Sequence, residues 1–223
     1  MRVRRTLTTL VLTAAVAGGG LATAGAASAD DGLHAAQARA RHAIDVRLMT
    51  LANDARRIDL SKTITSAHRD SLSATIQNDV NGLRALRDKI DADTTVADVK
   101  ADRAHIYTDY RVYALLGPQV GTVLRGDDQI AWANNLLAKL AKLTGKNAYR
   151  QAQLDHAKTL LTDAQALAGS AETTVLGYTP AQVTDGVTPV AVVEARASLA
   201  TAGADILVAR ALIRAVREDA SSS

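Results

Sequence analysis

The sequence predicts an all-α fold, an elongated antiparallel helical bundle of four to five long helices, and three observations support this prediction. Residues 189–217 repeat apolar side chains every seven positions over about four heptads, which indicates a helix packed lengthwise on other helices. Phe is absent and Trp occurs once, so the core is aliphatic, which suits closely packed helices better than a sheet. The chain also has no cysteine, so its stability must come from burial and not from disulfides.

The last segment carries two apolar registers. They consist of Val192, Leu199, Ile206 and Ile213, and, three positions further on, Ala195, Ala202, Ala209 and Val216. The flanking residues Val193, Leu207, Val208 and Leu212 are also apolar. They predict a stripe wide enough to contact several neighbouring helices.

Residues 1–29 are predicted to be an export signal that is removed. A basic start is followed by an apolar run at 7–16 and by an Ala-Ser-Ala motif at 27–29, the arrangement of a cleaved signal peptide and not of a membrane span. We therefore expect a protein that is secreted or associated with the cell envelope. Residues 30–220 are expected to form a single helical-bundle domain, and residues 221–223 a disordered tail.

The formal charge of +3 belongs entirely to this signal. Its three arginines, Arg2, Arg4 and Arg5, are its only charged residues, so the remaining chain has 23 basic and 23 acidic residues. This balance gives no support to nucleic-acid binding. No later apolar run is long enough to cross a membrane, so we expect no transmembrane segment in the mature chain.

The other helices follow from apolar spacing and from their end signals. Apolar residues at three- and four-residue steps predict helices over residues 33–58, 66–90, 95–143 and 147–175. Ser66 is the expected N-cap of the second, and Thr95 with Asp98 begins the third in the manner of a capping box. The third helix is expected to be kinked or restarted near Pro118, because proline cannot donate the helical hydrogen bond. Two prolines and two glycines mark a loop over residues 177–189.

The best candidate site lies on the third helix, at Asp98, Asp102, His105 and Asp109. Steps of four, three and four residues place these side chains on one stripe, and carboxylates with an imidazole are ligands for a divalent cation. The alternative is the solvated face of an amphipathic helix, with acidic residues favoured near the helix N-terminus. The Glu-x-x-His pairs of bundles with two metal ions are absent from the sequence.

A second cluster precedes Pro118 and comprises Tyr107, Tyr110, Arg111 and Tyr113. These residues either line a small ligand pocket beside the kink or serve as the bulky core residues of a protein without Phe. The remaining histidines, His34, His42, His68 and His156, are scattered and carry no metal-binding motif.

Two segments resemble a group of uncharacterised exported all-helical proteins of Gram-positive, high-GC bacteria. One is residues 106–119, and the other is the pattern of Ala195, Arg196, Leu199, Ala202, Asp205, Ile206, Ala209, Arg210 and Ile213. The resemblance implies export and a helical fold and assigns no catalytic residue.

The sequence therefore predicts a non-catalytic structural or interaction module with a protein or cell-envelope partner, and no cofactor. No nucleophile elbow, phosphate loop or dinucleotide fingerprint is present to indicate an enzyme. The alternative is an exported bundle that binds a small ligand or a metal ion through the third helix. The long apolar faces are also compatible with a homo-oligomer.

Overall fold

The computed structural model describes residues 22–184 and 188–221, which form helices joined by short loops and contain no strand. The helices are α1 (Ala22–Leu60), α2 (Ser66–Ala92), α3 (Val96–Thr108), α4 (Gly117–Leu140), α5 (Ala148–Leu176) and α6 (Val190–Ser221), with a π-helical turn η1 (Val112–Leu116) and a 3₁₀ turn η2 (Pro180–Gln182). The predicted all-α class is confirmed. The predicted export signal lies largely outside the described residues, and of the predicted tail only Ser221 lies within them.

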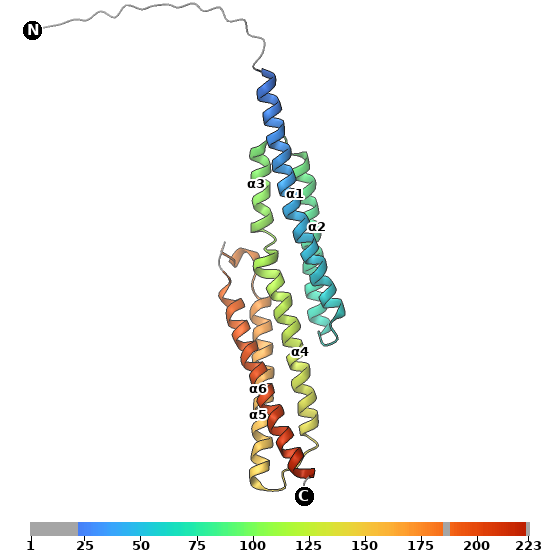
Figure 1. Cartoon of the computed structure of the whole chain (residues 1–223), viewed down its shortest axis with the longest axis vertical. Helices are drawn as coiled ribbons and strands as arrows, with labels where there is room; N and C mark the ends of the chain where they lie inside the picture. Colours follow the sequence, from blue (N-terminus) through green and yellow to red (C-terminus); the bar gives the residue numbers. More distant parts are fainter. Residues whose placement is uncertain (1–21, 185–187, 222–223) are drawn as a thin grey trace, which may run out of the picture.

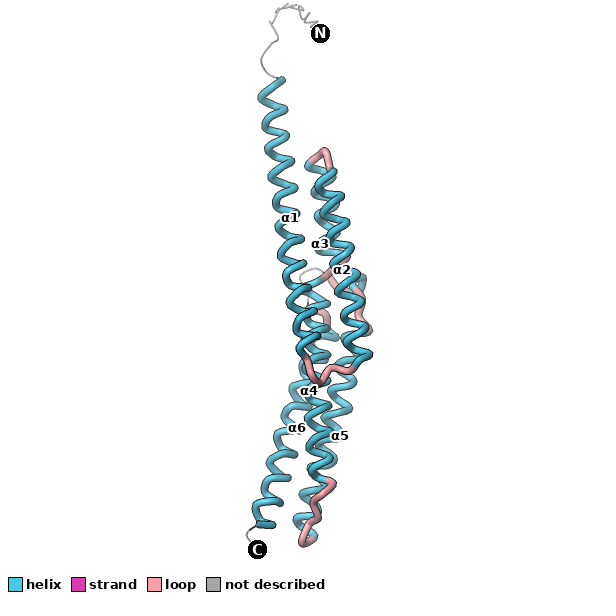
Figure 2. Tube along the Cα trace, turned by 90° about the vertical axis from the view of Figure 1, so that its right-hand side faces the viewer, coloured by secondary structure: helices cyan, strands magenta, loops and turns pink. Residues whose placement is uncertain are grey.

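The six helices form two three-helix bundles placed end to end (Figures 1 and 2). The first bundle contains α1, α2 and α3, and the second contains α4, α5 and α6. The lower parts of α1 and α2 lie beside the upper part of α4, so the two bundles overlap near the middle of the molecule (Figure 1). Consecutive helices are antiparallel except for α3 and α4, which follow one another in the same direction.

The helix starts follow the predicted end signals closely. The N-cap of α2 is Thr65 and not Ser66, and its hydroxyl accepts a hydrogen bond from the His68 amide. Thr95 caps α3 through the Asp98 amide, and Asn147 caps α5 through the Arg150 amide. Each cap satisfies an amide that has no partner within the helix.

The two predicted registers of α6 form the core of the second bundle, since all eight side chains are buried. The expected wider stripe is wrong for Val193, Leu207 and Val208, whose side chains are 54%, 55% and 48% exposed. The reason is that α6 packs mainly on α5 and α4, so only a narrow face is covered. One cluster of buried apolar residues nevertheless extends from α1 through α4 and α5 to Leu199 of α6 and joins the two bundles.

The predicted interruption of the third helix is present but lies upstream of Pro118. Helix α3 ends at Thr108, Arg111 adopts the left-handed conformation with φ of 42°, and η1 follows. Pro118 occupies the first turn of α4, where a missing amide donor costs little. The amide of Gly117 bonds to the carbonyl of Val112, five residues earlier, and this wide turn leads the chain into α4.

Within the described residues, none of the helices combines the length and the apolarity needed to span a membrane.

Candidate metal centre

Three buried or half-buried ionisable side chains meet where the two bundles overlap. His68 comes from the first turn of α2, Asp127 from the middle of α4 and Glu172 from the last third of α5. One ligand atom from each lies within 4.8 Å of the other two. Among the described residues this is the one group of three or more His, Asp or Glu side chains with such a spacing.

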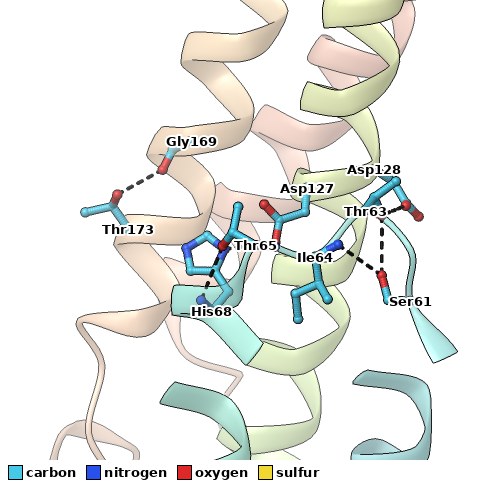
Figure 3. A network of polar contacts seen from close by, with 9 residues as sticks. All are labelled: Ser61, Thr63, Ile64, Thr65, His68, Asp127, Asp128, Gly169 and Thr173. Atoms are coloured by element: carbon cyan, nitrogen blue, oxygen red, sulfur yellow. Dashed lines mark hydrogen bonds and ion pairs between the residues drawn. The ribbon is translucent and has the colours of Figure 1, made fainter. Parts of the chain in front are cut away.

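The loop before α2 fixes the position of His68. Asp127 Oδ2 accepts hydrogen bonds from the Thr65 amide, at 3.2 Å, and from His68 Nδ1, at 2.9 Å. Figure 3 shows this turn of α2 facing Asp127 on α4, with Gly169 and Thr173 marking the adjacent turns of α5. On the other side of the loop, Thr63 donates to the carboxylate of Asp128. Residues 63–68 are therefore tied to α4 by two successive aspartates.

Glu172 lacks the partners that Asp127 has. Its side chain is 4% exposed, and its Oε1 makes no hydrogen bond. Burial, followed by the nearby charge of Asp127, raises the pKa of Glu172 to about 7, and His68 opposes this rise. An unpaired buried carboxylate is costly, so a cation in this position would remove a penalty that the folded chain otherwise carries.

The space for the Glu172 carboxyl group is provided by Gly126. A Cβ atom at residue 126 would overlap Oε1 of Glu172 and lie 2.7 Å from its Cδ. The glycine thus lets a carboxylate of α5 approach the backbone of α4, next to Asp127. The approach brings two acidic side chains together in the interior, where their charges repel each other. Close packing alone therefore does not explain why Glu172 occupies this position.

The ligand set is one imidazole nitrogen and two carboxylate oxygens. This combination suits a divalent transition-metal ion such as Zn²⁺, Mn²⁺ or Fe²⁺ better than Ca²⁺, which takes six to eight oxygen ligands. Metal–ligand bonds of about 2.0–2.2 Å place ligand atoms roughly 3–4 Å apart, so small side-chain rotations would close the observed spacing. The His68 side chain is 23% exposed, whereas that of Asp127 is 3% exposed, so the group opens to solvent on the His68 side.

The structure does not bring the four predicted residues of α3 together. Asp98 is exposed and accepts a hydrogen bond from Thr95 at the helix start. Asp102 is buried and pairs with Lys89 of α2 at 2.7 Å. His105 and Asp109 form an exposed pair at 2.8 Å, in which the hydrogen bonds to Thr108 and His105 lower the pKa of Asp109 against the effect of burial. The stripe therefore divides into a helix cap, an ion pair between helices and a surface pair.

The predicted tyrosine cluster surrounds the break between α3 and α4. Its centre is Arg47 of α1, which the sequence did not single out: the guanidinium carbon lies 4.5 Å from the ring centre of Tyr107 and 5.1 Å from that of Tyr113. These two rings are 40% and 49% exposed. Tyr110 instead packs against Gly82 of α2. The cluster thus fastens η1 and the end of α3 to α1 through cation–π contacts.

For Asp127 and Glu172 the sequence holds a signal, a charge at or next to a core position. Asp127 lies seven residues after Val120 and between the apolar positions Val123 and Ile130, where the register requires a core residue. Glu172 is one of only three glutamates in the sequence and follows the buried Ala171. The spacing within one helix cannot reveal the group, because its three members come from three helices.

No family model, curated protein or solved structure matches this chain in the comparisons with known proteins.

Proposed function

We propose that this protein is an exported helical bundle that binds one divalent transition-metal ion through His68, Asp127 and Glu172. The observation that carries the proposal is the buried carboxyl group of Glu172: its Oε1 makes no hydrogen bond, and one of its two oxygens lies within 4.8 Å of ligand atoms of His68 and Asp127. The export signal expected at residues 1–29, and the resemblance of residues 106–119 to exported helical proteins, support the proposed location outside the cytoplasm.

The role proposed for the metal ion is structural. His68 belongs to the first bundle, whereas Asp127 and Glu172 belong to the second, so one ion would cross-link the two where they overlap. The carboxylates are buried and only the imidazole is partly exposed, which leaves room for an ion and for water but little for a substrate. This arrangement supports a binding and scaffolding role without catalysis.

The chain provides a matched pair of histidines for the test. His68 and His105 each contact an aspartate, at 2.9 Å and 2.8 Å, but only His68 also lies near a third ligand. Metal-free protein is titrated calorimetrically with Zn²⁺ and Mn²⁺, and Mg²⁺ serves as the hard-cation comparison. We expect one site per chain, and we expect His68→Gln to weaken binding by at least about tenfold, in line with loss of one of three ligands.

His105→Gln is the control variant and is expected to leave the affinity unchanged. The proposal fails if the purified protein binds none of these ions, or if the His105 and His68 variants lose affinity equally. Preferential loss in the His105 variant would instead assign binding to the α3 stripe predicted from the sequence.

A second candidate function is an interaction module, and the exposed apolar residues of α6 favour it. Val193, Leu207 and Val208 are about half exposed along a helix that has no covering neighbour on this side. A second copy of the chain is the simplest occupant of this face, as the long heptad repeat suggests. Sedimentation velocity over a range of concentrations tests the idea: Leu207→Lys is expected to dissociate a dimer, and a monomer at all concentrations would exclude this candidate.

A further inference from the structure

A groove with three arginines lies on the side of α4 that faces α1 and α6. Its volume is about 550 Å³, and it is lined by Arg57 of α1, Arg125 of α4 and Arg196 of α6, with Tyr113, Pro118 and Thr122 among the remaining lining residues. We call this the arginine groove. An adjoining groove of about 570 Å³ shares Arg57 and Arg125 with it and adds one cation, Lys62, and one carboxylate, Asp128.

The lining of the arginine groove contains no carboxylate, so two of its three charges, those of Arg125 and Arg196, are not balanced there. Arg125 and Arg196 are exposed, and neither forms a hydrogen bond or ion pair with another described residue. Arg57 donates to Asp54 at 2.8 Å, and that carboxylate is 7% exposed, so it lies beneath the surface. The ion pair fixes the Arg57 guanidinium, whose Nη2 lies 3.8 Å from where a Cβ at Gly121, another lining residue of the groove, would be.

Such an arrangement is unusual in a chain whose charges otherwise balance. Like charges that face one open space repel each other, and an anion in that space replaces repulsion with attraction. The guanidinium groups of arginine are planar and present donors in pairs, which suits carboxylates and phosphates. Three guanidinium groups supply more hydrogen-bond donors than the two oxygens of a carboxylate can accept. A phosphate group, with three terminal oxygens, is therefore the better match.

The remaining lining adds features that a site for a bare ion does not need. The ring of Tyr113 is 49% exposed and is held by a hydrogen bond from Thr50 to its hydroxyl oxygen. Pro118 and Leu199 supply apolar surface at the same groove. A ligand with a phosphate group joined to a ring or a carbon chain would contact both kinds of surface.

We propose that the arginine groove binds a phosphorylated ligand through Arg57, Arg125 and Arg196. The ligand is either a small phosphorylated molecule or one phosphate-bearing repeat of an anionic polymer. This site is separate from the metal centre, because Asp127 is two residues from Arg125 and so lies about 160° from it around the axis of α4. The proposal therefore goes beyond the proposed function and does not depend on it.

The test uses metal-free full-length mature protein, since phosphates chelate metal ions. Pyrophosphate is titrated calorimetrically at constant ionic strength, with sodium sulfate and sodium acetate as the other anions. The double variant R125Q/R196Q removes two charges from the groove. The control R39Q/R84Q removes two exposed charges from α1 and α2 outside it. Both variants are checked for an unchanged melting temperature.

We expect pyrophosphate to bind the parent protein and the R39Q/R84Q control alike, and R125Q/R196Q to bind at least about tenfold more weakly. Equal loss in both double variants would mean non-specific attraction and would overturn the proposal, as would no binding at millimolar pyrophosphate. Acetate binding as tightly as pyrophosphate would overturn the assignment to phosphate. A long polyphosphate chain then separates the two sources: tighter binding at equal phosphate concentration indicates a polymer, and equal binding indicates a small ligand.

Discussion

The substitution Glu172→Gln separates a metal-ligand role from a packing role, because the metal-free and metal-bound proteins should respond with opposite signs. The folded state raises the pKa of this carboxyl group from 4.5 to about 7, so its ionisation penalty is absent below pH 4.5 and complete above pH 7. Each pKa unit is worth about 1.4 kcal/mol, which gives an upper value of about 3 kcal/mol at pH 8. Solvent screening reduces this to roughly 1–2 kcal/mol. The metal-free variant should be more stable by that amount at pH 8 and unchanged at pH 4.

The effect in the presence of metal is a loss. A ligand at one hundred times its dissociation constant stabilises the folded state by about 2.7 kcal/mol. In a domain of this size each kcal/mol moves the melting temperature by about 2–4 °C, so zinc should raise that of the parent protein by about 5–11 °C. A neutral amide is a poor zinc ligand, and the shift in the variant should fall below about 2 °C.

Thermal unfolding followed by far-ultraviolet circular dichroism measures both effects, with and without zinc. The matched control is Glu194→Gln, which makes the same chemical change at an exposed position of α6. If the Glu172 variant is less stable than the parent without metal, or if it keeps the full zinc shift, then Glu172 is a packing residue and the metal-ligand assignment is refuted.

Three further predictions concern stability alone and can be measured by urea denaturation. Gly82→Ala should lower the free energy of unfolding by about 1–3 kcal/mol, because the new Cβ would lie 2.6 Å from the Tyr110 hydroxyl. Gly169→Ala should raise it by about 0.5–1 kcal/mol, because no atom lies within 4 Å of the new Cβ and Ala favours the helix. Equal effects of the two substitutions would contradict this prediction. Burial raises the pKa of Asp79 from 3.8 to about 6, so this group destabilises the fold as pH rises through that range. Asp79→Asn should then gain roughly 1 kcal/mol at pH 8 after solvent screening and nothing at pH 3, and a gain that does not vary with pH would be inconsistent with this cause. Arg47→Met should cost about 1–2 kcal/mol, since it removes a cation from two tyrosine rings, and a neutral outcome would show that these contacts are incidental.

The parts of the fold that repetition determines could be predicted from the sequence. In α6 the seven-residue repeat of Val192, Leu199 and Ile206 fixes which face is buried, and the structure buries all three. What the repeat does not fix is the number of neighbours. Leu207 is as apolar as Leu199 but stays 55% exposed, because three-helix packing covers only a narrow face. The number of neighbours depends on the whole chain and not on one helix.

The position of the break between α3 and α4 could not be predicted from Pro118 alone. Pro118 excludes a helical hydrogen bond at its own nitrogen, and the chain meets this constraint by starting α4 at Gly117. The strained residue is Arg111, a residue type with no preference for the left-handed region. Arg111 lies between Tyr107 and Tyr113, whose rings both contact Arg47 of α1, and this contact joins segments far apart in the sequence.

The candidate metal centre also depends on contacts between segments far apart in the sequence. The positions of the buried charges support its proposed role as a cross-link between the two bundles. Asp127 on α4, Glu172 on α5 and Asp54 on α1 are buried carboxylates, and Asp54 lies against Gly117 at the start of α4. A junction built only from apolar side chains would tolerate sliding and rotation, since apolar contacts have little directional preference. Buried charges that must be paired restrict the two bundles to few relative positions. A metal ion with ligands from α2, α4 and α5 would restrict them to one. If the ion sets the register of the two bundles, then its removal should lower the cooperativity of unfolding. Calorimetry should then show the two bundles melting separately in metal-free protein and together with zinc bound, and a single transition in both forms would argue against this role.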